Sequence, residues 1–122
     1  MSELNLKQFE KKLKIRLLNI KDYEAITVLQ KKCFPKMKPW SAEQFRSLVS
    51  IFPEGQLCIE YNRKIIASCS SLILNFNEYS ANHNWNEITN GGFITNHDPN
   101  GDTLYGIEIM TSPDYRGLKL SL

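Results

Sequence analysis

The sequence has few of the residues that build metal sites or disulfide frameworks. Its 122 residues include three cysteines, an odd number, and no two of them are spaced as CxxC. The two histidines, His83 and His97, do not make a zinc ligand set. We therefore expect reduced thiols, no metal and a cytoplasmic location.

Long apolar runs are also missing. No stretch approaches the roughly 20 apolar residues that are needed to cross a bilayer. Residues 1–13 are lysine-rich and lack the apolar core of a secretory signal. These absences argue against a membrane partner. With 42% hydrophobic and 23% charged residues, the composition fits one globular domain.

Charge of one sign is not in large excess, since the net charge is only +2. It is unevenly spread, however: residues 1–40 hold ten Lys or Arg against four Asp or Glu, and residues 41–122 hold five against nine. A basic first third can indicate nucleic-acid binding. Because aromatic residues do not interleave these lysines, we favour a solvated face and predict no nucleic-acid partner.

The chain does contain a regular series of helix and strand signals. Residues 14–18 alternate as a first strand does. Asn19 and Asp22 have the spacing of a capping box, which predicts a helix over residues 19–33. Ser41 and Gln44 repeat this signal before a second helix that ends near Phe52.

The middle of the chain predicts a β-hairpin followed by a long connection. Two apolar runs, residues 56–61 and 64–74, are separated by a short polar pair. Residues 75–102 are rich in Asn, and a connection of this length is usually functional or hides an element. The connection carries four acidic residues and no Lys or Arg, so it is either a rim that attracts an amine or a solvated loop.

The last twenty residues carry the clearest functional pattern. Residues 104–111 form an apolar, β-branched run typical of a buried strand. Pro113 ends the strand, and Arg116-Gly117 opens a presumed helix. A helix start offers unpaired N–H groups to a phosphate. The alternative is that Arg-Gly belongs to an ordinary β-turn.

The sequence Ser-Pro-Asp-Tyr-Arg-Gly at residues 112–117, with residues 118–121, resembles the pyrophosphate loop of the GNAT N-acetyltransferases. Arg116 and Gly117 fit that pattern, Lys119 stands where the family has glycine, and Ser121 takes the small-residue place. Residues 85–117 are further similar to the GNAT domain that is fused ahead of a carbon–nitrogen hydrolase (nitrilase-type) domain. The resemblance covers residues 14–122, after a tail or short helix at residues 1–13.

The resemblance implies an α/β (α+β) fold, a GNAT-like mixed and mostly antiparallel sheet flanked by helices, of which only the N-terminal part is present. It implies direct transfer of an acetyl group from acetyl-CoA to a small-molecule or peptide amine, and a C-terminal hydrolase domain as a partner. The segment at residues 34–40 would border the acceptor, and the usual acid lies beyond Leu122. The implied cofactor-binding residues are Ile109, Met110, Thr111, Arg116, Gly117, Leu118, Lys119, Leu120 and Ser121.

Two residues are candidates for catalysis. Glu108 lies on the strand beside the cofactor and would act as general base if it faced the buried side of the sheet; otherwise it is a solvated carboxylate. His97 is the second candidate, because the adjacent Asp98 can support its charged form. The alternative for His97-Asp98-Pro99 is a turn.

Three functions stay open at this point. The first is an N-acetyltransferase. The second is a non-catalytic acyl-CoA-binding or regulatory domain of a hydrolase-fused protein, which Lys119 favours because glycine allows closer approach to a pyrophosphate. The third is an interaction domain without a cofactor.

Overall fold

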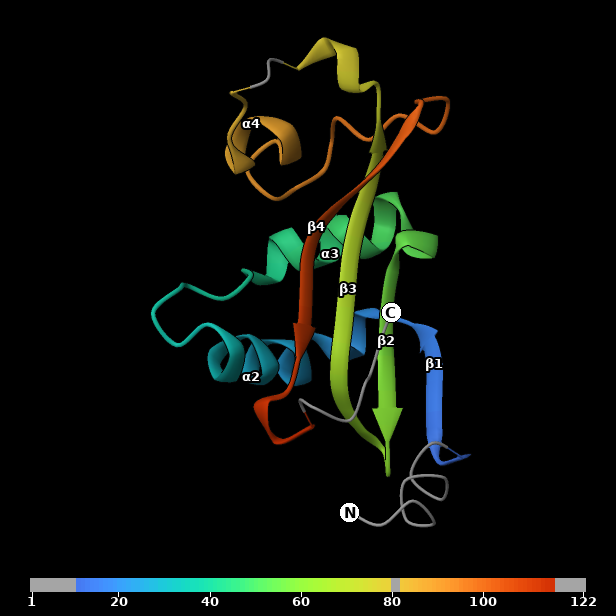
Figure 1. The fold of residues 1–122 in the computed structure, drawn as a ribbon, viewed down its shortest axis with the longest axis vertical. Coiled ribbons are helices and arrows are strands. Elements are labelled where there is room, and N and C mark those ends of the chain that lie inside the picture. The colour runs from blue at the N-terminus through green and yellow to red at the C-terminus, as the bar shows by residue number, and fades with distance from the viewer. Residues whose placement is uncertain (1–10, 80–81, 116–122) are drawn as a thin grey trace.

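The computed structural model describes residues 11–79 and 82–115, and a four-stranded antiparallel sheet organises them (Figure 1). The strand order is β1-β2-β3-β4, so each strand pairs with its neighbour in the sequence. This agrees with the expected α/β architecture, a mostly antiparallel sheet flanked by helices. The strands are β1 (Leu13–Leu17), β2 (Gln56–Tyr61), β3 (Lys64–Leu74) and β4 (Thr103–Thr111).

Both predicted capping boxes are present and start helices. Asn19 caps the 3₁₀ turn η1 (Ile20–Asp22), which continues into α2 (Tyr23–Cys33). Ser41 accepts a hydrogen bond from Gln44 N–H at the start of α3 (Ala42–Ile51), and the Gln44 side chain bonds back to Ser41 N–H. These reciprocal bonds satisfy backbone donors that a helix start leaves open.

The hairpin between β2 and β3 turns on two residues with positive φ, Asn62 at 49° and Arg63 at 65°. Positive φ at both central positions gives the turn a twist that matches the twist of paired strands. A further 3₁₀ turn, η2 (Pro53–Gly55), leads from α3 into β2.

The long connection between β3 and β4 contains a helix that the sequence did not predict. After η3 (Phe76–Glu78), α4 (Trp85–Thr89) begins at Asn84, whose side chain accepts a hydrogen bond from Glu87 N–H. Asn90 ends this helix in the left-handed region at φ 51°. The connection therefore holds a hidden element, one of the two outcomes expected for its length.

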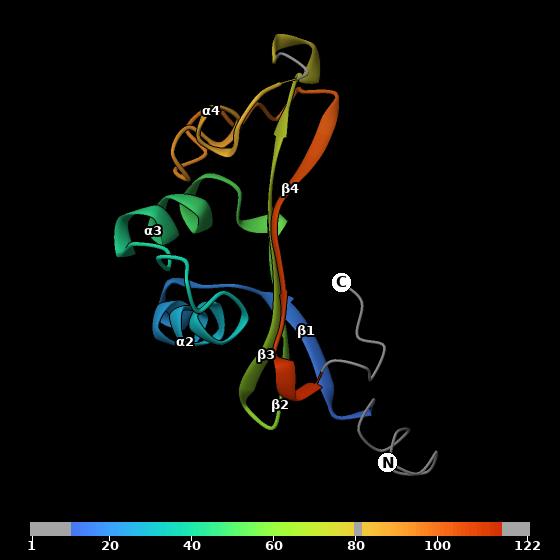
Figure 2. The same ribbon diagram turned by 60° about the vertical axis from the view of Figure 1, so that its left-hand side comes forward.

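All three helices lie on one face of the sheet (Figure 2). The main core fills the space between them and the sheet, and its largest members include Ile26, Phe45, Leu48, Leu72 and Ile88. A smaller cluster around Ile59, Ile66 and Ala67 lies apart from this core, with Tyr61 and Tyr115 packed against it. None of the helices in the described ranges is long and apolar enough to cross a membrane.

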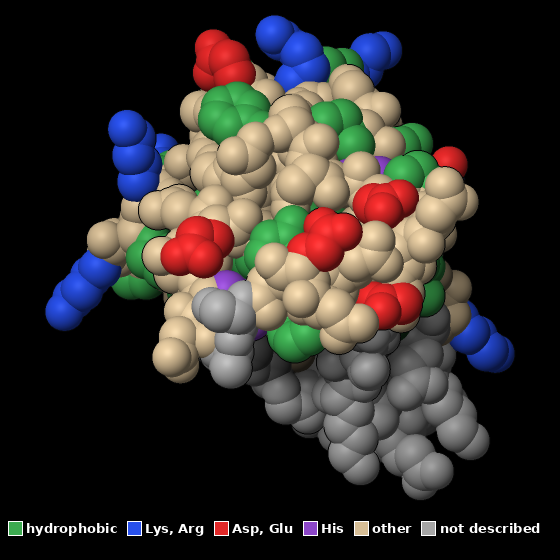
Figure 3. All heavy atoms as spheres, turned by 90° about the horizontal axis from the view of Figure 1, so that it is seen from above, with side chains coloured by type: hydrophobic (Ala, Val, Ile, Leu, Met, Phe, Trp, Pro, Cys, Tyr) green, Lys and Arg blue, Asp and Glu red, His purple; other side chains and the backbone are tan. Residues whose placement is uncertain are grey.

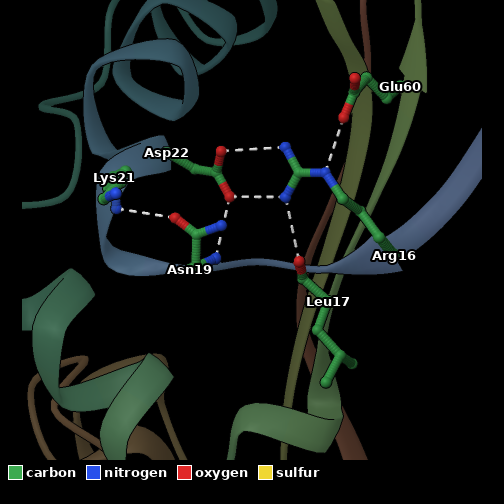
Figure 4. A network of polar contacts seen from close by, with 6 residues as sticks. All are labelled: Arg16, Leu17, Asn19, Lys21, Asp22 and Glu60. Atoms are coloured by element: carbon green, nitrogen blue, oxygen red, sulfur yellow. Dashed lines mark hydrogen bonds and ion pairs between the residues drawn. The ribbon is translucent and has the colours of Figure 1, made fainter. Parts of the chain in front are cut away.

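A polar network connects the first strand to η1 and β2 (Figure 4). The Arg16 guanidinium donates to both oxygens of Asp22, at 2.8 and 3.0 Å, and to Glu60 at 2.6 Å. Burial alone would raise the pKa of Asp22, but the hydrogen bonds from Arg16 and from Asn19 N–H hold it below its ordinary value. A short edge strand is thus held by charge-assisted bonds as well as by its ladder.

Candidate active site

A cavity of about 830 Å³ opens between the helices and the edge strand β4. The loop between α2 and α3 forms one wall, α4 and the loop after it form another, and the middle of β4 forms the floor. The lining residues are Gln30, Phe34, Met37, Lys38, Pro39, Trp40, Ser41, Gln44, Trp85, Phe93, Ile107, Glu108 and Ile109.

A β-bulge in β4 directs Glu108 into this cavity. Ser70 pairs with Glu108 and Ser71 pairs with Gly106, so Ile107 is an extra residue in the strand. Successive side chains of a regular strand point to opposite faces, and one inserted residue reverses that alternation. As a result Ile107 and Glu108 both line the cavity, although they are adjacent in the sequence.

The Glu108 carboxylate is partly buried and accepts hydrogen bonds from two side chains, Gln30 and Trp40. Gln30 Nε2 lies 3.0 Å and Trp40 Nε1 lies 2.9 Å from its Oε1 atom. Burial raises the pKa of Glu108 above its ordinary value, because a low dielectric disfavours the charged form, while the bonds from Gln30 and Trp40 act in the opposite direction. A carboxylate with a raised pKa can take a proton near neutral pH.

Gln30 connects three parts of the site. Its Oε1 accepts a hydrogen bond from Trp40 N–H at 2.9 Å, so its Nε2 must be the atom that faces Glu108. Gln30 is only 5% exposed, and Tyr23 Oη donates to Trp40 O at 2.8 Å. These bonds from α2 fix the Trp40 backbone, and with it the indole that contacts Glu108.

The two tryptophans of the chain form an aromatic wall. The Trp40 and Trp85 rings are 5.5 Å apart and tilted by 38°. Gly92 lies beside them at φ +88°, where an added Cβ would come within 2.8 Å of Trp40, Trp85 and Gln44 side-chain atoms. Glycine is required here both for the backbone angle and for the close approach.

The outer edge of β4 offers backbone groups beside Glu108. Ser112 N–H bonds to Ile66 O, so the alternate residues Met110 and Glu108 direct their N–H and C=O groups toward β3. Ile109 and Thr111 then direct theirs away from β3, and Cys33 Sγ donates to Thr111 O. Within the described ranges β4 has no second strand beside it.

Two known proteins are similar to the chain in sequence. "Probable hydrolase YhcX" of Bacillus subtilis is 52% identical over 121 residues, which cover 98% of this chain and 24% of that protein. "Uncharacterized N-acetyltransferase YkwB" of the same organism is 43% identical over 110 residues, 87% of this chain and 49% of that protein. No family model matches the chain.

Among solved structures, the loading GNATL domain of CurA from Lyngbya majuscula superposes with a TM-score of 0.73 at 16% identity, covering 86% of this chain and 50% of that one. The described chain has a GNAT-like fold. The GphF GNAT-like decarboxylase, solved with isobutyryl-CoA, gives 0.66 at 18% identity and covers 85% of this chain and 51% of that one. The chain thus spans a quarter to a half of the length of the proteins that it matches.

The fold brings some of the predicted site residues together and leaves others apart. Glu108 and Ile109 line the cavity with the predicted acceptor segment around Trp40, whereas the Met110 side chain is buried in the core. Thr111 lies further along the same edge. The remaining cofactor-loop residues, Arg116, Gly117, Leu118, Lys119, Leu120 and Ser121, lie outside the described residues.

His97, the second catalytic candidate, is not among the residues that line the cavity. Its Nδ1 accepts a hydrogen bond from Ile73 N–H at 2.9 Å, and its ring stacks on Phe52 at 4.3 Å. Burial lowers the pKa of His97, against the opposing charges of Asp98 and Glu54. In this position the ring accepts the Ile73 N–H near the end of β3, and Asp98 N–H bonds to Ile73 O beside it. Both bonds attach the β3–β4 connection to β3.

The acidic residues of the β3–β4 connection do not line the cavity either. Figure 3 looks onto this end of the molecule and shows acidic side chains distributed over its surface. Asp98 accepts from Asn75 Nδ2 and Asn100 N–H, and Asp102 accepts from Phe76 N–H. The carboxylates of Asp98 and Asp102 therefore form hydrogen bonds between the two ends of the connection.

Sequence reasoning missed Gln30 and Trp85 as site residues. Gln30 did leave a signal: it stands four residues after the buried Ile26, on the helix face that packs against the sheet. A polar residue in such a stripe must find a partner inside. Trp85 left no comparable signal, because its position depends on a helix that has only five residues.

Proposed function

We propose that this GNAT domain binds the acceptor for transfer of an acetyl group from acetyl-CoA to an amine by direct attack. The observation that carries the proposal is a partly buried carboxylate, Glu108, in a large cavity next to the open edge of β4. The relative YkwB is named an N-acetyltransferase, and the GphF decarboxylase was solved with isobutyryl-CoA. Both support acyl-CoA chemistry on this fold.

The residues present fit an acyl-CoA at the edge of β4. Ile109 has backbone groups that point away from β3, and it also lines the cavity. We assign these groups, together with residues 116–121, to holding the co-substrate. Acetyl-CoA would supply the acetyl group as a thioester, and a backbone N–H aimed at the thioester oxygen would stabilise the negative charge that develops there.

Glu108 is the base in this proposal. An amine reaches the site as an ammonium ion and must lose one proton before its nitrogen can attack. Glu108 accepts that proton, and the neutral nitrogen attacks the thioester carbon. As the C–N bond forms and the C–S bond breaks, the nitrogen loses its second proton and the released thiolate gains one, directly or through water. Gln30 and Trp40 hold the carboxylate in position during this transfer.

The test is release of CoA thiol from acetyl-CoA by the intact protein with a panel of amines. Glu108→Gln should lower kcat/KM by about 10²–10⁴-fold, the usual contribution of a general base. Glu78→Gln is the matched control, because Glu78 is an exposed carboxylate outside the cavity. Equal activity of wild type and Glu108→Gln would overturn the assignment of the base.

A second candidate function is a non-catalytic acyl-CoA-binding domain attached to a hydrolase. The match to a quarter of a probable hydrolase favours it, as does Lys119 in the loop. Binding of acetyl-CoA without thiol release for any amine would support this candidate. No binding at all would leave only an interaction domain.

A further inference from the structure

We propose that the cavity selects a primary amine, bound as an ammonium ion, that carries an apolar or aromatic body. This inference deepens the proposed function and depends on it only for the transfer step. It follows from which polar groups of the lining are already paired, where the charges lie and what the walls are made of.

The two amide side chains of the lining, Gln30 and Gln44, are already engaged by the protein. Gln30 uses its Oε1 for Trp40 N–H and its Nε2 for Glu108. Gln44 uses its Oε1 for Ser41 N–H and its Nε2 for Gly91 O. Since each of these groups would have to give up a partner to bind a ligand, they offer little to a sugar or another polyol.

Glu108 keeps acceptor capacity for a ligand. Its Oε1 receives Gln30 at 3.0 Å and Trp40 at 2.9 Å, but its Oε2 receives only the longer Gln30 contact of 3.3 Å. An ionised carboxylate has about four lone-pair sites on its two oxygens. The polar demand of the cavity is therefore for a donor, and a cationic donor forms the stronger bond.

The charges of the lining are unequal in effect. Glu108 is its one acidic residue and Lys38 its one basic residue, and no other titratable group of the described chain is among the lining residues. Lys38 is exposed on the loop after α2, so water and salt screen its charge. Glu108 is partly buried beside indole rings, where a charge interacts more strongly. An organic anion is disfavoured at the floor for the same reason.

Apolar side chains make up the rest of the walls. Trp40 and Trp85 stand beside Glu108, and Phe34, Phe93 and Ile107 extend the apolar surface. Aromatic faces attract ammonium groups and also cover hydrocarbon. With a volume of about 830 Å³, the cavity has room for a body much larger than a methyl group.

The test is equilibrium binding of four probes at pH 7.5: 2-phenylethylamine, 2-phenylethanol, 3-phenylpropanoate and methylamine. An alkylamine is protonated at this pH, since its pKa resembles that of lysine, about 10.4. The only tryptophans of the chain are Trp40 and Trp85, so intrinsic fluorescence reports on the cavity directly. We expect 2-phenylethylamine to bind at least about tenfold more tightly than each of the other three probes.

Two variants separate the charge from the walls. Glu108→Gln should remove the preference for 2-phenylethylamine over 2-phenylethanol, and Glu78→Gln should keep it. Trp85→Leu should reduce the preference for 2-phenylethylamine over methylamine; Trp85 is 41% exposed, so this change spares the core. Equal binding of the amine and the alcohol by wild type, or an unchanged preference in Glu108→Gln, would overturn the inference.

The fate of this inference and that of the proposed function can be told apart. Selective binding of 2-phenylethylamine without thiol release from acetyl-CoA would retain the cavity's specificity and reject the transferase. Thiol release that depends on small polar amines, without selective binding of 2-phenylethylamine, would retain the transferase and reject the specificity.

Discussion

Two opposing effects act on the pKa of the Glu108 carboxylate. Burial favours its neutral form, and the donors from Gln30 and Trp40 favour its charged form. The net result is a raised pKa, so burial has the larger effect. A group in this state costs the fold stability when ionised and gains a proton readily, which is what a base requires.

The first prediction concerns the stability of Glu108→Gln. A glutamine oxygen can still accept from Gln30 and Trp40, but no charge is buried. Because the folded-state pKa of Glu108 is raised from 4.5, wild type loses stability as pH rises through that folded pKa. We expect the Tm of Glu108→Gln to equal or exceed that of wild type at pH 7.5, and this difference to shrink at pH 4.

Thermal unfolding of both proteins at the two pH values measures this difference. The quantity to compare is the Tm of Glu108→Gln minus the Tm of wild type. If this difference is negative at pH 7.5 and disappears at pH 4, the ionised carboxylate stabilises the fold. The hydrogen bonds would then have outweighed burial.

Gln30→Met provides the second prediction. The change leaves the buried Trp40 N–H without its acceptor, which should cost about 1–3 kcal/mol of unfolding free energy. It also removes a donor that lowers the pKa of Glu108. The acidic limb of the pH profile of kcat/KM should therefore move to higher pH.

Gln44→Met is the matched control for Gln30→Met. Gln44 lines the same cavity and also spans two partners, Ser41 N–H and Gly91 O, but neither is Glu108. We expect it to lower stability and leave the pH profile in place. If both variants move the profile equally, Gln30 has no particular influence on the carboxylate.

At the scale of elements, local signals predicted what local interactions determine. The capping boxes at Asn19 and Ser41 start the helices, and the polar pair at Asn62-Arg63 turns the hairpin, because these contacts lie within a few residues. The helix α4 escaped prediction, since five residues carry little periodicity.

The site followed the same division. Glu108 could be proposed from its strand, but its direction depends on the bulge at Ile107. The isolated Gly106 beside that position is typical of a bulge, although it does not specify which way Glu108 points. Its contacts with Gln30 and Trp40 join residues 78 and 68 positions apart. Such contacts arise from packing, which sequence periodicity does not specify.

The third prediction tests the segment that follows α4. Gly91 and Gly92 both have positive φ, but an added Cβ at Gly91 would meet only Phe93, at an ordinary contact distance of 3.9 Å, whereas at Gly92 it would meet three side-chain atoms at 2.8 Å. Gly91→Ala should cost about 1–2 kcal/mol through the backbone alone. Gly92→Ala should cost a further 1–3 kcal/mol or so from overpacking.

Urea unfolding and tryptophan emission distinguish these two effects. Only Gly92→Ala should also shift the emission of the native state, because it displaces Trp40 and Trp85. Equal costs and unchanged emission in both variants would mean that the two indoles do not depend on the space beside Gly92.

Within the part of the chain that the structure describes, the helices lie on one face of the sheet and β4 lies at one edge of it (Figures 1 and 2). The cavity lies where this edge meets the helices, so an acceptor held there would sit beside Ile109. The chain spans about half of the two GNAT structures that it resembles. An acyl donor would reach the same edge from the β4 side, which separates the two substrates in space.

The last prediction concerns the donor side of the intact protein. If residues 116–121 hold the pyrophosphate, Arg116→Ala removes a cationic donor, and Gly117→Asp adds a negative charge where backbone N–H groups should meet the phosphates. We expect each change to weaken CoA binding by about tenfold or more, as the loss of a charge-assisted hydrogen bond does. Arg46→Ala, an exposed arginine on α3, is the matched control and should bind CoA as wild type does. Calorimetry with CoA measures all three variants, and 2-phenylethylamine binding should stay unchanged in each, because the acceptor cavity is built from other residues. Unchanged CoA affinity in both Arg116→Ala and Gly117→Asp would mean that the pyrophosphate lies elsewhere, and the open edge of β4 would then have to be matched to a different donor.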